Sequence, residues 1–334
     1  MKAQFEKEQS DTGEFQRQED AFREWISADG STPYPAVAGR YHLYVSLACP
    51  WASRTVIFRE LKGLEQAIGM TVVDPIRDEK GWAFRDPNKK WDDTEVIPPS
   101  TDPVNGFHYL SEAYAATDPD FDGRVTVPVL WDKVTKKIVN NCEDDICRMF
   151  NDAFNAIALN KELVLSEAQR TRMDVDLFPK DIEDEHTKLA DFLYENVNNG
   201  VYKAGFATRQ RPYEISCRKL FEALDELEAR LSKSRYLFDK RIVEADWRLF
   251  CTLIRFDVVY HGHFKCNIRR IVDYPNLQGY LMDLYQQPGI AETVNFDHIK
   301  RHYYMTHTKI NPNRIVPIGP AFDLTKPHGR EKIS

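Results

Sequence analysis

A cysteine at the start of a predicted helix is the first residue of this sequence that could carry out chemistry. The motif Cys49-Pro50-Trp51-Ala52 follows a β-rich alternating stretch, Tyr41–Val45, and precedes a helical pattern that ends at Gly63. A thiol in that place faces unpaired backbone N–H groups and the positive end of the helix dipole, and both favour the nucleophilic thiolate. Because residue 52 is alanine, a Cys-x-x-Cys dithiol is absent. Redox chemistry here would use one thiol, with an external thiol resolving the mixed disulfide; a buried structural cysteine is the alternative.

A proline at the start of another strand is the second feature. Val127-Pro128 lies in the β-rich run 125–131. Proline is tolerated at the first residue of a strand, and a cis proline there would present the backbone N–H and C=O of Val127 to an extended ligand. An ordinary proline of an edge strand is the alternative. A thioredoxin-like domain typically has a Cys-Pro motif between a strand and a helix, and a Val-Pro motif at the start of a later strand.

The predicted strands and helices that must position these residues divide the chain into an α/β part and a helical part. A strand at 41–45, a helix at 52–62 and a strand at 69–73 suit a βαβ unit. A long polar insertion follows at 76–124. Two further strands then begin at 125 and 137, and a helix is expected at 143–155. Helical periodicity then dominates 181–199, 213–233, 246–261 and 275–287. We predict an N-terminal extension at 1–40, an α/β domain at 41–155 and an all-helical domain with a Pro/Gly-rich tail at 160–334.

Composition excludes several classes of protein. The 334 residues include 45 Lys+Arg and 52 Asp+Glu, a formal net charge of −7, which argues against nucleic acid as the main partner. No apolar run approaches the ~18 residues that a membrane span needs. The charged N-terminus has no apolar core of a secretory signal, and six cysteines at irregular spacing suit reduced thiols. These features predict a cytoplasmic protein that is not bound to a membrane.

Longer motifs point to a family. They lie in order at 49–52, 58–65, 81–84, 123–132, 198–207, 245–250, 261–267, 298–304 and 310–312. In this order they resemble the Xi class of glutathione transferases, the glutathionyl-hydroquinone reductases, over most of the chain. The resemblance implies a thioredoxin-like N-terminal domain, an all-helical C-terminal domain, glutathione as co-substrate and a homodimer.

The resemblance also implies a reaction and its residues. Cys49 would attack the glutathione sulfur of a glutathionyl-hydroquinone and release the hydroquinone, and a second glutathione would resolve the enzyme disulfide. Phenolic hydroxyls can donate hydrogen bonds to the ring oxygens during this step. The expected catalytic residues are Cys49, Tyr202 and Tyr303. The expected glutathione contacts are Trp82, Val127, Pro128, Cys142 and Glu143, and the expected hydroquinone contacts are Tyr202, Tyr303 and Tyr304. For each single tyrosine or tryptophan, simple packing is the alternative.

A metal site has little support in the sequence. His298 and His302 are spaced to share a helix face, which two zinc ligands could use. No third ligand with suitable spacing is evident, so we predict no metal and expect these histidines to face solvent or to be satisfied in the core. Glycine-rich nucleotide loops of the common types are also missing.

Three departures from the family lie near the expected glutathione site. The family shows Glu-Ser where this chain has Cys142-Glu143, an arginine near Ser111, and commonly a histidine at Ser53. A carboxylate at Glu143 would repel the γ-glutamyl carboxylate, although it could bind the glutathione amine and the helix N-terminus would still attract an anion. Two alternatives therefore stay open: a diverged thioltransferase that uses another thiol or disulfide, and a non-catalytic ligand-binding protein of the same fold.

Overall fold

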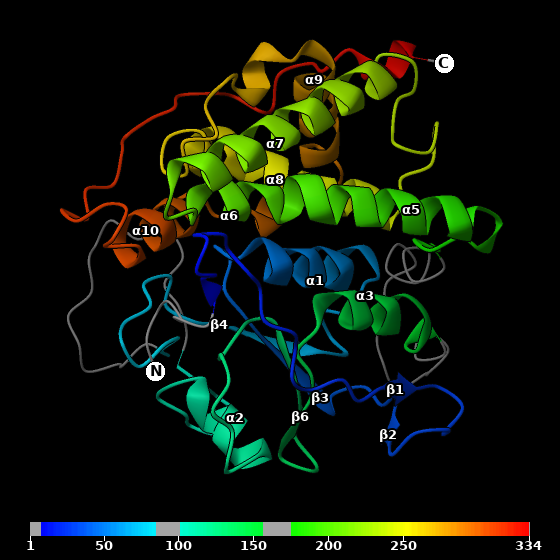
Figure 1. The fold of residues 1–334 in the computed structure, drawn as a ribbon. Coiled ribbons are helices and arrows are strands. Elements are labelled where there is room, and N and C mark those ends of the chain that lie inside the picture. The colour runs from blue at the N-terminus through cyan, green and yellow to red at the C-terminus, as the bar shows by residue number, and fades with distance from the viewer. Residues whose placement is uncertain (1–7, 85–100, 156–174, 334) are drawn as a thin grey trace. The chain divides into compact units, whose positions relative to one another are not determined.

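The computed structural model describes residues 8–84, 101–155 and 175–333, and the chain divides into two compact units (Figure 1). Unit 1 contains Gln18–Asp176 and Thr293–His307, and unit 2 contains Gln4–Arg17, Leu177–Glu292 and Thr308–Ser334. This division differs from a single cut near residue 160 in two places. Residues 293–307 pack with the sheet, because side chains of their helix form hydrogen bonds with the backbone of the loop after β4. The N-terminal segment up to Arg17 packs with the helices.

A four-stranded mixed sheet forms the centre of unit 1 (Figure 1). Its order is β4-β3-β5-β6, with β3 and β4 parallel and the other neighbours antiparallel. The strands are β3 (Tyr41–Val45), β4 (Gly69–Val72), β5 (Val129–Asp132) and β6 (Lys137–Asn140). Helix α1 (Pro50–Leu61) makes the parallel crossover, so the predicted βαβ unit is confirmed. A separate pair of short parallel strands, β1 (Ile26–Ser27) and β2 (Tyr34–Pro35), precedes the sheet.

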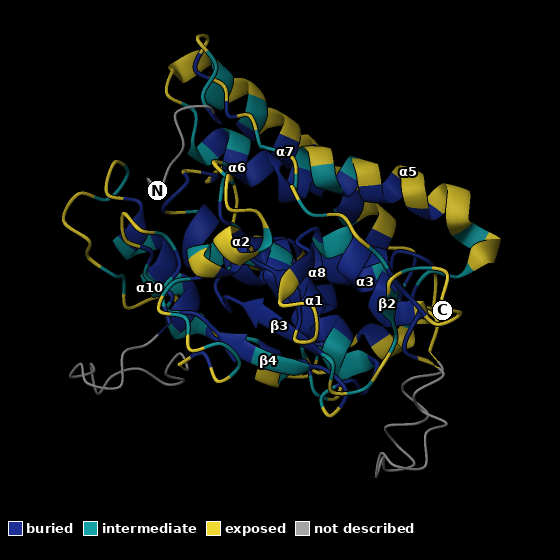
Figure 2. Cartoon of the chain, turned by 90° about the horizontal axis from the view of Figure 1, so that it is seen from below, coloured by how far each residue is buried: buried dark blue, intermediate teal, exposed yellow. Residues whose placement is uncertain are grey.

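Local sequence explains where α1 begins and ends. Pro50 occupies the first helical position, where its missing N–H leaves nothing unsatisfied, and Gly63 with φ of +63° follows the helix. Helix α1 packs against α3 (Glu143–Asp152), and α2 (Ser111–Thr117) contacts β6. Figure 2 shows β3 buried along its whole length, as expected for a central strand covered on both faces. Helix α2 was not predicted, since it lies inside the stretch interpreted as a polar insertion.

Unit 2 is helical, as predicted. Its elements are η3 (Lys180–Ile182), α5 (Glu183–Leu193), η4 (Tyr194–Asn198), α6 (Gly200–Gly205), α7 (Gln210–Leu231), α8 (Glu244–Arg255), η5 (Phe256–Tyr260), η6 (Ile271–Asp273), α9 (Pro275–Tyr285), η7 (Ala291–Thr293, at the border with unit 1) and η8 (Arg330–Lys332). The leucine stripe of α7 is buried while the opposite face is exposed (Figure 2). No helix among the described residues has both the length and the apolar character that crossing a membrane requires.

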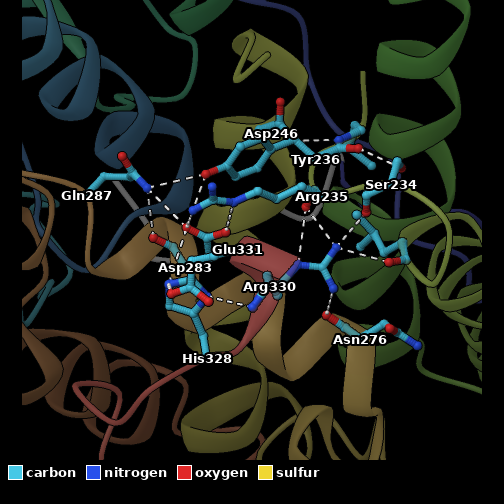
Figure 3. A network of polar contacts seen from close by, with 12 residues as sticks. Ser234, Arg235, Tyr236, Asp246, Asn276, Asp283, Gln287, His328, Arg330 and Glu331 are labelled. Atoms are coloured by element: carbon cyan, nitrogen blue, oxygen red, sulfur yellow. Dashed lines mark hydrogen bonds and ion pairs between the residues drawn. The ribbon is translucent and has the colours of Figure 1, made fainter. Parts of the chain in front are cut away.

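The C-terminal tail is fixed to unit 2 by a buried arginine (Figure 3). The guanidinium of Arg330 donates to the carbonyl oxygens of Ser234 at 2.6 Å, Arg235 at 2.8 Å and Leu231 at 3.0 Å. These carbonyls lie at and just after the C-terminal end of α7, where four carbonyl groups have no partner within the helix. A residue near the end of the chain therefore completes the hydrogen bonding of a helix about a hundred residues earlier.

Candidate active site

Cys49 lies at the N-cap of α1, at the carboxyl end of β3. Its side chain is partly exposed, and its sulfur lies 3.6 Å from the carbonyl oxygen of Val127. The Val127–Pro128 peptide bond is cis, and β5 begins at the next residue, Val129. The two motifs that the sequence singled out separately thus meet at one end of the two central strands, β3 and β5. A thiol at this position can contact a ligand that also bonds to the backbone of Val127.

A buried polar cluster holds Val127 in place. The hydroxyl of Tyr114, on α2, donates to the carbonyl oxygen of Thr126 at 3.0 Å and accepts from the Thr126 N–H at 3.1 Å. Asn141, just before α3, donates through its side-chain amide to the Tyr114 hydroxyl and to the Thr126 hydroxyl, both at 3.2 Å. Three elements that are distant in sequence therefore fix the backbone beside Cys49. No local sequence signal indicated Tyr114 as a supporting residue.

The N-terminus of α3 carries the predicted residues Cys142 and Glu143. Cys142 is its N-cap, and burial, followed by the nearby charge of Glu143, raises the pKa of its thiol to about 12. Glu143 pairs at 3.0 Å with the guanidinium of Arg54 on α1, which also pairs with Asp144. Burial raises the pKa of Glu143 to about 7, with the neighbouring Asp144 adding to the effect and Arg54 opposing it. The helix of Cys49 is therefore clamped to the start of α3 by charge.

Asp20 joins Cys142 and Glu143 in the closest group of potential metal ligands among the described residues. Their ligand atoms lie within 4.8 Å of one another. A thiol with a raised pKa is a poor metal ligand, because metals bind the thiolate. The cluster instead places two carboxyl groups at a helix start, an arrangement able to bind an ammonium group.

Trp82 lies in a cluster of aromatic rings to which helix α10 (Phe296–Thr306) contributes. Its indole stacks on the imidazole of His302, with centroids 4.9 Å apart and planes at 19°, and the guanidinium of Arg77 lies 5.0 Å from the Trp82 ring centroid. His302 Nδ1 is 2.7 Å from the carbonyl oxygen of Pro75, which can only accept, so Nδ1 carries the proton. The predicted tyrosine Tyr303 is buried next to His302, with ring centroids 5.1 Å apart.

The structure thus brings Trp82 and Tyr303 to one cluster within unit 1. The sequence analysis considered its central member, His302, only as a zinc ligand, a solvent-facing residue or a core residue, and did not predict its contact with Trp82. Both histidines considered as zinc ligands, His298 and His302, are buried, so they are core residues and do not face solvent. The stack on Trp82 had no signal in the sequence, because the two residues are far apart along the chain. Tyr304, the third predicted tyrosine, is half-buried, and burial raises its pKa.

Tyr202, the other predicted catalytic tyrosine, belongs to unit 2 and lies on α6. It is buried among Phe15, Phe206, Tyr260 and Phe264, with ring centroids 5.5 to 6.4 Å from its own. Ser111, where the family has an arginine nearby, is the first residue of α2. Ser53 is buried in α1, and its N–H donates to the Cys49 carbonyl oxygen at 2.9 Å.

A thioredoxin-like sheet with a lone cysteine at the first helix, in one chain with a helical unit, defines a glutathione transferase of the cysteine type. The family model for the glutathione S-transferase N-terminal domain matches residues 48–153, and that for the C-terminal domain matches residues 208–281. The chain belongs to the glutathionyl-hydroquinone reductase family, the Xi class of the glutathione transferases.

Similarity extends over nearly the whole chain. The glutathionyl-hydroquinone reductase YqjG of Escherichia coli is 48% identical over 327 residues, covering 96% of this chain and 93% of the relative. The reductase PcpF of Sphingobium chlorophenolicum is 42% identical over 315 residues, covering 94% and 92%. The glutathione-bound structure of YqjG has a TM-score of 0.83 at 47% identity, covering 93% of this chain and 96% of that one. The Xi transferase of Phanerochaete chrysosporium has a TM-score of 0.82 at 47% identity, covering 92% and 97%.

Proposed function

We propose that this protein reduces S-glutathionyl-hydroquinones to hydroquinones with glutathione, through a mixed disulfide on Cys49. The observation that carries the proposal is the position of the Cys49 sulfur, at the N-cap of α1 and 3.6 Å from the carbonyl oxygen of Val127. The helix N-terminus favours the thiolate, and the backbone of Val127 can pair with an extended peptide such as glutathione. The two curated relatives of the same family that carry this activity in their names support it.

The reaction takes place in two balanced steps. In the first, the Cys49 thiolate attacks the glutathione sulfur, an S–S bond forms, and the bond from sulfur to the aromatic carbon breaks. The electron pair stays with the ring carbon, which takes up one proton, so the hydroquinone leaves. In the second, the thiolate of another glutathione attacks the mixed disulfide and releases oxidised glutathione and the Cys49 thiolate. Overall, one conjugate and one glutathione give one hydroquinone and one glutathione disulfide.

Three tyrosines are the proposed substrate residues. Tyr202 and Tyr303 would donate hydrogen bonds to the oxygens of the hydroquinone ring and assist the proton transfer to the carbon, and Tyr304 would contact the ring. Both Tyr202 and Tyr303 are buried among other aromatic rings, which suits a flat apolar substrate. A phenol carries a hydrogen-bond donor on an apolar ring, and this chemistry supports the role.

Glutathione would bind in unit 1 at the end of the central strands β3 and β5. We assign Trp82, Val127, Pro128, Cys142 and Glu143 to its contacts. The carboxyl groups of Asp20 and Glu143 lie close together and would bind the ammonium group of the γ-glutamyl residue, while the N-terminus of α3 attracts its carboxylate. Glu143 thereby takes part in binding where other members of the family use a serine. We further propose that the enzyme acts in the cytoplasm as a homodimer.

The proposed function is tested by turnover of a glutathionyl-hydroquinone with excess glutathione, followed by release of the hydroquinone. Wild type should release it, and Cys49→Ser should lose about three orders of magnitude or more of the rate, because the nucleophile is gone. Cys251→Ser, a buried cysteine of α8 in unit 2, is the matched control and should keep the rate. Absence of release by folded wild type would contradict the proposal.

A diverged thioltransferase is the second candidate, and Glu143 is the observation that favours it. Its carboxylate lies at a helix start that would otherwise be free to receive a carboxylate. A resolving thiol with an amine and no second carboxylate would suit that place. Comparison of glutathione with cysteamine as the resolving thiol separates the two candidates: a higher kcat/KM for glutathione supports the reductase, and a higher value for cysteamine supports the alternative.

A further inference from the structure

The N-terminal segment Gln9–Arg17 is anchored to the residues that follow α6 in unit 2. The side-chain amide of Gln9 donates to the carbonyl oxygen of Phe206 at 3.0 Å, and the N–H of Thr208 donates to the carbonyl oxygen of Gly13 at 3.0 Å. Gly13 has φ of +88°, and a Cβ there would lie 2.8 Å from the side chain of Arg209. The close approach therefore requires glycine, and it fixes the residues that follow.

Two side chains of this segment reach the ring of Tyr202. Phe15 stacks on it with centroids 6.4 Å apart at 30°, and the guanidinium carbon of Arg17 lies 4.9 Å from its centroid. Arg17 is also 5.5 Å from the ring centroid of Phe15. A guanidinium within about 6 Å of an aromatic centroid is in the range of a cation–π interaction.

Asn199 holds Arg17 in this position. Its side-chain oxygen accepts from Arg17 Nε at 3.1 Å, and the residue is buried at the start of α6. Tyr202 lies one turn further along the same helix, so the acceptor and the ring are parts of one rigid element. Arg17 and Asn199 also line a cavity of about 460 Å³, which gives the guanidinium room without the need to displace the ring.

A cation above a phenol ring helps to hold the ring in place, and it also affects how readily the hydroxyl group loses its proton. The cation is attracted by the electron density of the ring face, and that density rises as the hydroxyl proton leaves. The interaction therefore stabilises the partly deprotonated phenol more than the neutral one. We propose that Arg17 is a positioning residue for Tyr202: it holds the ring of Tyr202 in place and makes the hydroxyl proton easier to transfer to the substrate. The part that concerns the substrate depends on the proposed function of Tyr202.

Other groups around Tyr202 do not supply this charge. The rings packed against it belong to Phe15, Phe206, Tyr260 and Phe264, of which Tyr260 alone is titratable. His263, beside Phe264, has a pKa lowered to about 4 by burial and is neutral near pH 7. Lys203, the neighbour of Tyr202 in sequence, is paired with Glu195. Over the ranges that the structure describes, Arg17 is thus a cation that lies over the ring.

The test uses 3-fluorotyrosine incorporated at residue 202 of the full chain, with its fluorine resonance followed against pH. The titration should move to higher pH in Arg17→Met, and Arg17→Lys should lie between that variant and wild type. Lys203→Met is the matched control, since it removes a cation on the same helix that does not lie over the ring, and it should leave the titration unchanged. With unmodified tyrosine, Arg17→Met should lower kcat about 3- to 30-fold, the range of a cation–π interaction, and change KM for glutathione little.

The two readouts separate the inference from the proposed function. An unchanged titration in folded Arg17→Met, or an equal shift in Lys203→Met, would overturn the role of Arg17. If Arg17→Met fails to fold, the comparison of Arg17→Lys with wild type takes its place, and identical titrations of these two would overturn the role as well. A shifted titration in a protein that releases no hydroquinone would support the Arg17–Tyr202 interaction and contradict the proposed function alone.

Discussion

Arg54 links the helix of the proposed nucleophile to the start of α3, and its replacement by methionine tests that link. Its side chain is only 2% exposed, and its guanidinium pairs with Glu143 at 3.0 Å and with Asp144. Methionine is also unbranched and fills much of the same space, so Arg54→Met removes the charge and leaves most of the packing. The expected loss of stability therefore comes from the uncompensated carboxylates.

The magnitude follows from how far each partner is buried. Glu143 is 13% exposed, so its carboxylate without a partner would cost about 3–5 kcal/mol as long as it stayed ionised, whereas Asp144 is 44% exposed and its pair contributes about 0–1 kcal/mol. Burial raises the pKa of Glu143 to about 7, so at pH 6 much of it is neutral and needs no cation. At pH 8 Glu143 can also take up a proton, which costs about 1.4 kcal/mol for a pKa about one unit below the pH. The destabilisation should thus be about 1–2 kcal/mol at pH 8 and about 1 kcal/mol lower at pH 6.

The assay is urea unfolding, followed by circular dichroism at pH 6 and pH 8, for wild type, Arg54→Met, Glu143→Gln and the double variant. The double variant should recover much of the stability lost in Arg54→Met, because no charge is then left buried and unpaired. Arg241→Met, which removes a highly exposed pair with Asp181, is the matched control and should leave the midpoint of unfolding nearly unchanged. A loss below about 1 kcal/mol in Arg54→Met at both pH values would refute the reasoning.

Three further predictions follow from the same structure. The raised pKa of Glu143 means that the folded state keeps a proton that the unfolded state loses between pH 4.5 and about 7, so this residue makes the free energy of unfolding fall as pH rises through that window; Glu143→Gln should reduce the slope in thermal melts. Arg330→Met should leave several buried carbonyl groups without a donor and lower the unfolding free energy by about 2–4 kcal/mol in urea titrations, whereas an unchanged midpoint would contradict the arrangement in Figure 3. Gly205→Ala would place a Cβ 2.1 Å from the ring of Phe264, so it should cost about 1–3 kcal/mol and disturb the rings around Tyr202; a protein as stable as wild type would argue against this packing.

Elements with a strong local pattern could be predicted from the sequence. Alternation in Tyr41–Val45, proline at the first position of α1 and the leucine stripe of α7 each encode an element within a short window, and the structure has all three. The proximity of Cys49 to Val127 could also be predicted, because only a few folds have a strand, a Cys-Pro motif and a Val-Pro motif in this order. The resemblance to a family supplied the rest of the expected site.

Contacts between distant segments could not be predicted. The stack of His302 on Trp82 and the pairing of Arg54 with Glu143 join residues that no periodicity relates. Helix α10 was not predicted, because its sequence lacks a strong apolar stripe: its buried residues are His298, Ile299, His302, Tyr303 and Thr306. Arg17 lies in a polar N-terminal stretch that looked like a simple extension, yet it packs over a predicted catalytic ring.

The most direct test of the central claim is a single turnover of a glutathionyl-hydroquinone by an excess of enzyme in the absence of free glutathione. Intact-protein and peptide mass spectrometry would locate the adduct, while the released hydroquinone is quantified in the same sample. The account predicts one glutathione bound in disulfide linkage to Cys49 for each hydroquinone released, and loss of the adduct when glutathione is added. Release of hydroquinone with no glutathione on Cys49, or with glutathione on another cysteine, would contradict it.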